Sequence, residues 1–344
     1  MGIKGDLQIM VYDVKTQRIT QEDVGKAYGI QDMYRDLKLD DCMQFEKLLA
    51  NLESAAATFV HTIRSGSKDV SITRAKLLDF KKFLVIMMYR HEGRRRQYYE
   101  ELFDFETRRS IQRHMGFNSI NDIRDVWFEN LKWIIKTPVH EINKELGKVN
   151  RLVLGEITEY EGPIHSAELM DFGHITWSYV CIWEAQEGSE FILTDNCFGC
   201  YEGHGSIIIF HNFFVISPEY VVVLVNRLYM DGIVKSMPCR KSWFEGFHSI
   251  PDCVYINKNA GGAKDFTPDD LFKYRRIVIP KQKVWLVNGI FLDEGHKYIS
   301  HRSNAAMYRS LMFYDKVKDK MFTNKHDYSV LRRRLFFEMN RTHR

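Results

Sequence analysis

The 344-residue sequence has few cysteines and no long apolar run. Its six cysteines are spread over the whole chain, unlike the dense cysteines of a small secreted domain held together by disulfides. No segment reaches the ~20 apolar residues that a membrane helix needs, and Met1–Asp6 contains no hydrophobic signal region. We therefore expect a soluble, cytoplasmic protein without a membrane partner.

The motifs of several common enzyme classes are also absent. The sequence has no Walker loop, no Gly-x-Gly-x-x-Gly after a strand, no His-Glu-x-x-His and no Gly-x-Ser-x-Gly. These absences argue against a P-loop nucleotidase, a dinucleotide-dependent oxidoreductase, a zincin protease and an α/β-hydrolase. No cofactor is expected. Cys197 and Cys200, followed by His204, have ligand-like spacing, but a second pair of ligands is missing, so we predict no metal site.

The formal net charge is only +4, yet the cations are clustered. Arginine clusters bind the phosphates of nucleic acids by releasing counterions, although they also occur on the solvated faces of helices. Six arginines in two runs of three are candidate nucleic-acid-binding residues: Arg94, Arg95, Arg96, Arg332, Arg333 and Arg334. Arg109 and His114 have the Arg-x4-His spacing of some helical metal-independent ribonucleases, in which the arginine polarises the phosphate and the histidine moves the proton.

The hydrophobic periodicity predicts an α+β fold. Residues 7–20 alternate as a β-hairpin does. Apolar residues then recur every three or four positions, which predicts helices at 40–65, from about 73 to 92, at 95–115 and at 119–147. Antiparallel strands are expected at 178–186, 190–195, 206–216 and 219–227, followed by helices at 283–300, 303–322 and 326–340.

We therefore expect one α+β domain over residues 1–344, with no internal repeat and no low-complexity linker. Residues 1–150 form its mainly helical part, with the hairpin at the start. Residues 151–344 supply an antiparallel sheet and the C-terminal helices, and the largely helical first half packs on that sheet.

The segment richest in strand signals, residues 183–230, also holds acids and amides. Because a buried carboxylate is costly unless it is paired or used, we look for a site here. Asp195 ends an apolar strand, and Glu184 and Glu190 would lie near each other across a predicted hairpin. We expect Asp195, Glu184 and Ser217 to be catalytic, and Glu190 and Asn196 to bind substrate. The alternative for Asp195 is a turn cap, since Asp-Asn favours turns.

Glu53 lies beside the apolar stripe of the helix predicted at 40–65. A carboxylate in this position needs a cationic partner, and Arg90 near the end of the next helix is the candidate. The pair is either an ion pair between helices or part of a pocket. We accordingly include Glu53 among the catalytic candidates and Arg90 among the substrate-binding ones.

Five stretches carry a resemblance to a known family: Y-G-I-Q-D-M-Y (28–34), E-K-L-L-A-N-L-E-S (46–54), L-T-D-N (193–196), V-I-S-P (215–218) and Asn288 in V-N-G-I-F. With these stretches the sequence resembles, over nearly its whole length, a fungal family catalogued as domain of unknown function 4238. That family implies no particular activity. Members often begin with a His/Tyr-Ile-Pro-Arg-Phe strand, which is missing here, and tend to have proline where this chain has Cys197. Asn288 is added to the substrate-binding candidates.

The sequence is also similar to fungal arginine-containing cyclodipeptide synthases, which join amino acids from aminoacyl-tRNAs without ATP. The Asp-Asp-x-x-Glu motif of that group is not present, since Asp40 and Asp41 are followed by an acid only at Glu46. This similarity implies a tRNA-dependent enzyme that forms a peptide bond between arginine, taken from arginyl-tRNA, and a second amino acid. The basic clusters would hold the tRNA and the acids the arginyl side chain. The alternatives are a nucleic-acid-binding protein or metal-independent ribonuclease, and a non-catalytic interaction protein.

Overall fold

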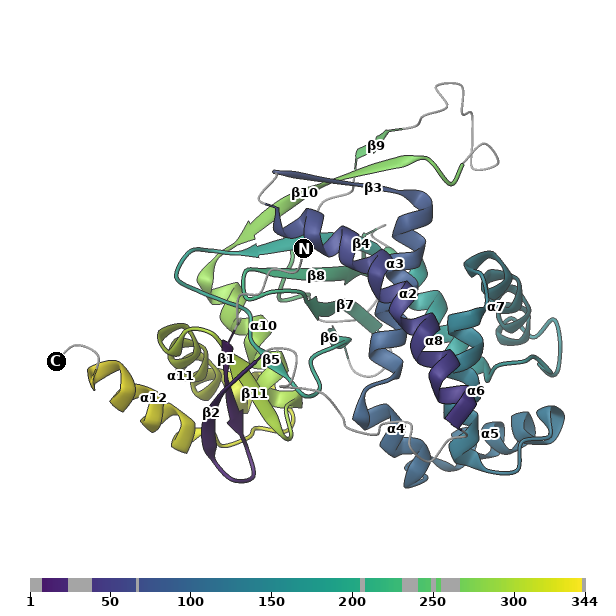
Figure 1. Ribbon diagram of the computed structural model, residues 1–344, viewed down its shortest axis with the longest axis horizontal. Helices are drawn as coiled ribbons and strands as arrows, with labels where there is room; N and C mark the ends of the chain where they lie inside the picture. Colours follow the sequence, from purple (N-terminus) through teal and green to yellow (C-terminus); the bar gives the residue numbers. More distant parts are fainter. Residues whose placement is uncertain are drawn as a thin grey trace. The chain divides into compact units, whose positions relative to one another are not determined.

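The computed structural model describes residues 8–23, 39–65, 68–204, 208–230, 241–248, 252–254 and 267–341. The fold is α+β, as predicted, with antiparallel-rich sheets and many helices (Figure 1). The chain divides into two compact units. We call Tyr34–Ser178 with Pro251–Lys273 the helical unit, and Met1–Met33, Tyr179–Ile250 and Tyr274–Arg344 the sheet unit. No helix in the described ranges combines the length and the apolar character that a membrane crossing requires.

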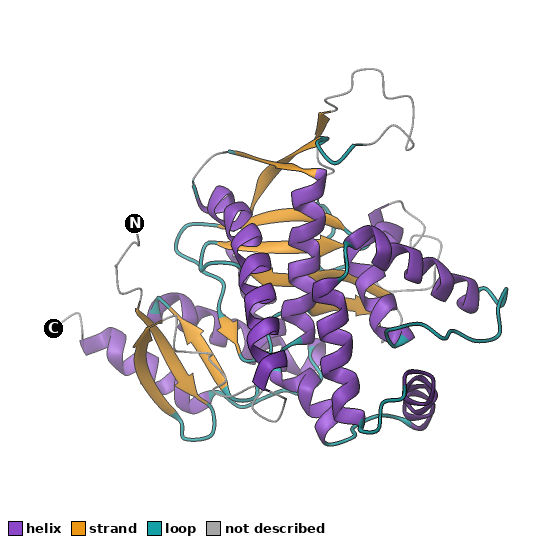
Figure 2. Ribbon diagram, turned by 45° about the vertical axis from the view of Figure 1, so that its right-hand side comes forward, coloured by secondary structure: helices purple, strands orange, loops and turns teal. Residues whose placement is uncertain are grey.

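Seven helices account for most of the described residues of the helical unit, shown in purple in Figure 2. They are α2 (Leu39–Arg64), α3 (Arg74–Tyr89), α4 (Glu92–Tyr99), α5 (Phe105–Asn118), α6 (Ile123–Lys136), α7 (Val139–Val153) and α8 (Ser166–Trp177). Strand β3 (Asp69–Thr73) precedes α3, and β9 (Asp252–Val254) pairs with the beginning of β10 (Leu271–Ile279), where the chain passes into the sheet unit. The helices predicted between residues 40 and 147 are thus confirmed, although the last two are each interrupted: the helix predicted at 95–115 is α4 and α5, and the one predicted at 119–147 is α6 and α7.

Local sequence signals set where these helices begin. Thr73, Asp104 and Asp122 are the N-caps of α3, α5 and α6, and each side chain accepts a hydrogen bond from a backbone N–H of the first turn. Helix α3 packs against α2, α6 and α8. Helix α8 approaches α7 at Gly173, where a Cβ atom would lie 2.8 Å from Leu146 Cδ2, so a larger residue would displace the Leu146 side chain.

The sheet unit contains two sheets. The first has the order β2-β1-β11-β5, from β1 (Gln8–Asp13), β2 (Arg18–Asp23), β11 (Tyr298–His301) and β5 (Leu193–Thr194). The strands of the second sheet that belong to this unit have the order β10-β4-β8-β7-β6, from β10, β4 (Tyr179–Ala185), β8 (Tyr220–Val225), β7 (Ile208–Val215) and β6 (Cys200–His204). All six residues of β8 are buried, as expected for a central strand rich in valine. Helices α9 (Arg227–Met230), α10 (Lys281–Glu294), α11 (Asn304–Met321) and α12 (Ser329–Arg341) complete the unit.

Two details of the predicted sheet are wrong. Residues 190–195 do not pair with 178–186 in a hairpin, because β5 pairs with β11 in the first sheet while β4 pairs with β8 and, in parallel, with β10. The helix predicted at 283–300 ends at Glu294, and β11 follows it. Both errors have one cause. Short strands such as β5 and β11 take their partners from distant parts of the chain, which local alternation does not specify.

Candidate functional site

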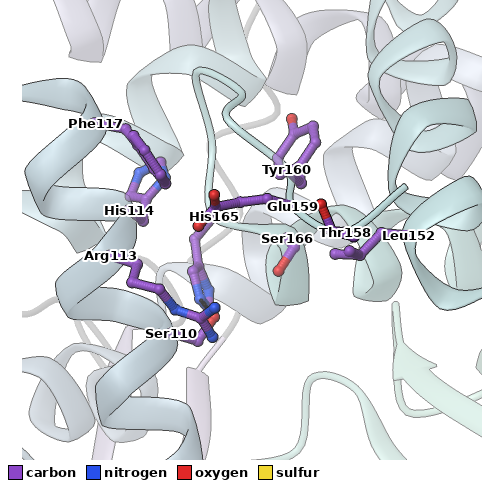
Figure 3. A pocket seen from close by; sticks show the side chains of 10 residues that line it. All are labelled: Ser110, Arg113, His114, Phe117, Leu152, Thr158, Glu159, Tyr160, His165 and Ser166. Carbon is purple, nitrogen blue, oxygen red and sulfur yellow. Dashed lines mark hydrogen bonds between the residues drawn. The ribbon is translucent and has the colours of Figure 1, made fainter. Parts of the chain in front are cut away.

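Helix α5 places four polar and aromatic side chains on one face, because Ser110, Arg113, His114 and Phe117 are three, four and seven residues apart. This face forms one wall of a cavity of about 200 Å³ in the helical unit (Figure 3). The end of α7, the loop after it and the start of α8 form the remainder of the wall. The full lining is Ser110, Arg113, His114, Phe117, Leu152, Thr158, Glu159, Tyr160, His165 and Ser166.

A serine and a histidine meet in this cavity. Ser110 Oγ lies 3.0 Å from Nε2 of His165, and Figure 3 shows the two side chains together below Ser166. His165 is the N-cap residue of α8, is only 3% exposed, and is held in place because its backbone N–H donates to Asn130 Oδ1 at 3.2 Å. Its other ring nitrogen, Nδ1, is buried, and none of the described residues hydrogen-bonds to it. When the proton is on Nδ1, Nε2 can accept the Ser110 hydroxyl proton, which is the arrangement of a nucleophile and its base.

A second histidine in the cavity has the opposite hydrogen-bonding role. Nδ2 of Asn118 lies 3.2 Å from His114 Nδ1, and an amide nitrogen can only donate. His114 Nδ1 is therefore the acceptor, and the ring proton is on Nε2. Nε2 is buried and has no hydrogen-bond partner among the described residues, so His114 holds an unused N–H donor in the wall of the cavity. The two imidazole rings meet edge to face, with centroids 5.8 Å apart.

Both imidazoles are neutral near pH 7. Burial, assisted by the neighbouring His165, lowers the pKa of His114 to about 4. Burial also lowers the pKa of His165. The negative charge of Glu168 raises this pKa and so opposes burial, whereas the positive charge of Arg94 lowers it further. A neutral pair suits His165 as a proton acceptor and His114 as a hydrogen-bond donor to a carbonyl oxygen.

Two further features favour negative charge at the cavity. The side chain of His165 does not cap the first turn of α8, although its carbonyl accepts from the N–H of Glu168 at 3.1 Å, and the cavity meets the positive end of the helix dipole here. Arg109 and Arg113 are exposed one turn apart on α5, and neither makes an ion pair with any described residue. Adjacent like charges on a helix repel each other, and an anion would relieve the repulsion.

The low pKa of His114 makes stability depend on pH. The folded-state pKa of about 4 lies below the ordinary 6.5, so the unfolded chain binds this proton first as the pH falls. The stabilisation is complete above pH 6.5 and is lost as the pH falls towards 4. We expect wild-type protein to lose about 3 kcal/mol more than His114→Gln protein across this window, measured by urea unfolding. Equal losses in the two proteins would show that His114 titrates normally.

Asp195 lies at the end of β5, as its position in the sequence predicted, and its side chain organises a turn. Its Oδ1 accepts hydrogen bonds from the backbone N–H groups of His296, Lys297 and Tyr298, at 3.0, 2.9 and 3.2 Å. The contacts are those of a cap that fixes the chain between α10 and β11.

Substitutions at Asp195 should therefore follow the behaviour of a cap. Asp195→Asn keeps an acceptor oxygen and should lower the free energy of unfolding by less than about 1 kcal/mol. Asp195→Ala removes the acceptor of the three N–H groups and should lower the free energy of unfolding by about 1–3 kcal/mol. Chemical denaturation of both variants measures the difference. A folded Asp195→Asn protein that has lost all product formation would instead place this carboxylate in a catalytic site.

The other candidates in the sheet unit also contact backbone. Glu190 Oε1 accepts from the N–H groups of Arg302 and Ser303, both at 2.9 Å. The buried Asn288 accepts from the N–H of Ile192 and donates to the carbonyl of Glu190 and to a serine hydroxyl. Ser217 Oγ accepts from the N–H groups of the turn that leads into β8. These groups tie loops to strands and helices.

Glu184 and Asn196 do not join this network. Glu184 lies on β4 opposite Tyr220 of β8, so the hairpin pairing that was expected to bring it near Glu190 does not form. The backbone carbonyl of Asn196 accepts from Cys200 Sγ at 2.8 Å. Cys197 and Cys200 are buried, burial raises the pKa of both thiols, and the described residues contain no group of ligands that could hold a metal ion.

In the helical unit, Arg90 and Glu53 form the predicted ion pair, with Nη1 and Oε1 3.1 Å apart. The side chains are 26% and 47% exposed, so solvent screens the pair and its contribution to stability is about 1 kcal/mol or less. The pair lies outside the lining of the cavity.

The arginine runs differ in their availability to a nucleic acid. Arg94 pairs with the buried Glu168 at 2.8 Å, Arg96 pairs with Glu100, and the guanidinium of Arg95 lies 4.0 Å from the centre of the Tyr99 ring. In α12, Arg332 pairs with Asp315, Arg333 donates to a backbone carbonyl, and Arg334 is exposed. Arg94 is the least available, because binding a phosphate would separate it from a buried carboxylate.

A comparison with protein families matches residues 4–305 to the family described as Protein of unknown function (DUF4238). The match covers most of the chain. The chain belongs to this family. Comparisons with curated proteins and with solved structures found no match. Membership confirms the family resemblance seen in the sequence and assigns no activity, so function has to be inferred from the geometry of the chain itself.

Sequence reasoning located part of this cavity. The Arg-x4-His spacing singled out α5 and His114, although the arginine that lines the cavity is Arg113 and not Arg109. Ser110 lies within the same stretch and was not recognised. His165 gave no signal, because it stands 55 residues away in a segment without a clear period and reaches Ser110 only in the tertiary structure.

Proposed function

We propose that the helical unit is an acyl-transfer enzyme that takes an amino acid from aminoacyl-tRNA and uses it to form a peptide bond. The observation that carries this proposal is the 3.0 Å contact between Ser110 Oγ and His165 Nε2 inside a cavity. A serine hydroxyl beside a neutral imidazole is an activated nucleophile for an ester carbonyl. Aminoacyl-tRNA is such an ester.

The proposed chemistry has two steps. Ser110 Oγ attacks the aminoacyl ester carbonyl while its proton passes to His165 Nε2. The oxyanion accepts a hydrogen bond from His114 Nε2–H and lies near the first N–H groups of α8. His165 then returns the proton to the departing ribose hydroxyl, which leaves an aminoacyl ester on Ser110. The amino group of a second aminoacyl ester attacks this intermediate, forms the peptide bond and restores the Ser110 hydroxyl.

Size and charge support an aminoacyl group in this position. The cavity of about 200 Å³ is smaller than the roughly 300–1,000 Å³ of most ligand pockets. It suits an amino acid better than a nucleotide, which would remain outside, where Arg109 and Arg113 favour phosphate. The carboxylate of Glu159 in the lining would complement the guanidinium of an arginyl group. We therefore propose arginyl-tRNA as one donor.

The test is to mix the purified chain with arginyl-tRNA, quench with acid and measure the intact mass of the protein. We expect an adduct with the mass of one arginyl residue, mapped to Ser110 and absent from Ser110→Ala protein. The tRNA recovered from the same reaction with a second aminoacyl-tRNA should carry a dipeptide as its ester. Absence of both the adduct and the dipeptide, with tRNA deacylation at the background rate, would refute the proposal.

A second candidate function is the cleavage of RNA, because two histidines and Arg113 share one cavity. Cleavage by acid–base catalysis needs one protonated imidazole at the start. With a pKa of about 4, His114 supplies little of that form at neutral pH. Fragments of uncharged tRNA, lost in His114→Gln protein, would favour this function over acyl transfer in the same experiment.

A further inference from the structure

A chain of polar side chains runs through the apolar core of the sheet unit. Glu202 of β6 and His211 of β7 are cross-strand partners, and Oε2 lies 3.0 Å from His211 Nδ1 (strands in Figure 1). The two side chains have no exposed surface. On the far side of the imidazole, His211 Nε2 lies 3.5 Å from Nδ1 of His248, whose ring is stacked on that of His211.

Aromatic rings surround this row of polar side chains. Trp183, Phe244 and Tyr229 have their ring centres 5.9, 5.7 and 5.5 Å from that of His211. A carboxylate in such surroundings is costly unless several donors stabilise it. At least three described residues donate to Glu202: Ser242 Oγ donates to Oε2 at 3.0 Å, the N–H of Trp243 donates to Oε1 at 3.1 Å, and His211 Nδ1 donates to Oε2.

The carboxylate determines where the imidazole protons lie. An ionised carboxylate only accepts, so His211 carries its proton on Nδ1 and has a lone pair on Nε2. That lone pair accepts from His248 Nδ1–H. His248 is thereby held as the Nδ1–H tautomer, and the lone pair on its Nε2 is at the end of the row that is farthest from Glu202. His248 is half-buried, and its burial and the neighbouring His211 lower its pKa to about 4, although the carboxylates of Glu245 and Glu202 act to raise it. At pH 7 the Nε2 lone pair of His248 therefore carries no proton.

We propose that Glu202, His211 and His248 form a hydrogen-bonded relay of fixed direction, and that His248 Nε2 is a second ligand site of this protein, for the hydroxyl group of a small neutral ligand. The ligand hydroxyl donates a hydrogen bond to the lone pair of His248 Nε2. Because the Nδ1 proton of His248 points to His211 and the Nδ1 proton of His211 points to Glu202, the carboxylate offsets the partial positive charge that this hydrogen bond places on the two imidazoles. No covalent bond is formed or broken.

The surroundings favour a neutral ligand with an apolar part. The carboxylates of Glu202 and Glu245 act on His248 and would repel an anion. Tyr229 meets the His248 ring edge to face at 5.2 Å, so a flat or aromatic alcohol would find an aromatic wall beside the base. This site uses none of the residues of the serine–histidine cavity, and the inference does not depend on the proposed acyl transfer.

The first test is to observe the tautomer in the full chain. Protein labelled with ¹⁵N-histidine gives ring-nitrogen resonances that separate protonated from unprotonated nitrogens, and His248→Gln protein assigns the His248 signals by their loss. We expect His248 to carry its proton on Nδ1, which is the minor tautomer of free histidine. A proton on Nε2 in the wild-type protein would overturn the relay, and this measurement requires no other variant to fold.

The second test measures the reactivity of the His248 lone pair with diethyl pyrocarbonate, which acylates unprotonated imidazole nitrogens. Peptide mapping compares His248 with His140, whose side chain is 71% exposed. We expect His248 to react at least as fast as His140 at pH 7. Glu202→Gln replaces the accepting oxygen with an amide that donates to His211 and so reverses both tautomers. It should slow the reaction at His248 by about tenfold or more, since an imidazole in the wrong tautomer is a poor base.

Ser242→Ala is the matched control. It removes one hydrogen bond to Glu202 but keeps the carboxylate and hence both tautomers, so His248 should react within about twofold of wild type. If Glu202→Gln and Ser242→Ala proteins react alike at His248, or if His248 is inert in the wild-type protein, the network only fastens residues 241–248 to β6 and β7, and the relay is refuted.

Discussion

Ser110→Ala protein is expected to lose acyl transfer by about 10³-fold or more while keeping its fold. The substitution removes the atom that would carry the aminoacyl group, and removal of a nucleophile in a serine–histidine pair leaves only the rate that binding and oxyanion stabilisation provide. Ser110 is half-buried on α5, and among the described residues its side chain hydrogen-bonds only to His165, so the stability cost should be about 1 kcal/mol. Rates of arginyl-tRNA consumption, measured at matched protein concentration, give the ratio.

Ser166→Ala is the control for this experiment, because Ser166 lines the same cavity and makes no hydrogen bond to either histidine. It should retain activity within a few-fold. Ser110→Cys should form the same adduct as a thioester, since a thiolate is also a nucleophile. If Ser110→Ala protein is as active as wild type while His165→Gln protein is not, the histidine acts as a base on a different nucleophile.

Glu168→Gln is expected to lower the free energy of unfolding of the helical unit by about 3–5 kcal/mol. Glu168 is buried in α8, its two carboxylate oxygens lie 2.8 Å from Nη2 of Arg94, and it accepts from the hydroxyl of Tyr98 at 2.6 Å. Neutralising it leaves the guanidinium of Arg94, only 25% exposed, without its main counter-charge. Chemical denaturation followed by far-UV circular dichroism measures the loss.

Asp171→Asn provides the comparison, because Asp171 also faces Arg94 but at 3.5 Å and with half of its side chain exposed. This substitution should cost about 1 kcal/mol or less. Equal losses of unfolding free energy for Glu168→Gln and Asp171→Asn would show that the buried pair of Glu168 and Arg94 contributes no more to stability than the exposed contact of Asp171. The pair also bears on the cavity, because Glu168 stands three residues after His165 in the first turn of α8 and helps to fix the helix end that carries the proposed base.

The acids that attracted attention in the sequence are mostly engaged in shaping the sheet unit. Asp195 and Glu190 each accept two or more backbone N–H groups, and Asp293 does the same for the loop before α12. A carboxylate that accepts several backbone donors fixes a loop strongly, because those donors would otherwise be buried without partners. Residue type and position near a strand end do not separate such a cap from a catalytic acid.

The sequence by itself determined the elements whose signals are local. The period of three to four residues set the helices between α2 and α7, the caps Thr73, Asp104 and Asp122 set three of their starts, and alternation set the hairpin of β1 and β2. The run of valines in β8 identified a buried strand. These features depend on residues within one or two turns of each other, so a pattern of neighbours is sufficient to predict them.

Only the tertiary structure decided which strands pair and which side chains meet. Pairing with β11 places β5 in a different sheet from β4, and so separates Asp195 from Glu184. Packing in the helical unit brings His165 to Ser110, and the pairing of β6 with β7 brings Glu202 to His211. Such contacts form when whole apolar faces are buried together, and the free energy of that burial depends on area and not on which residues along the chain supply it.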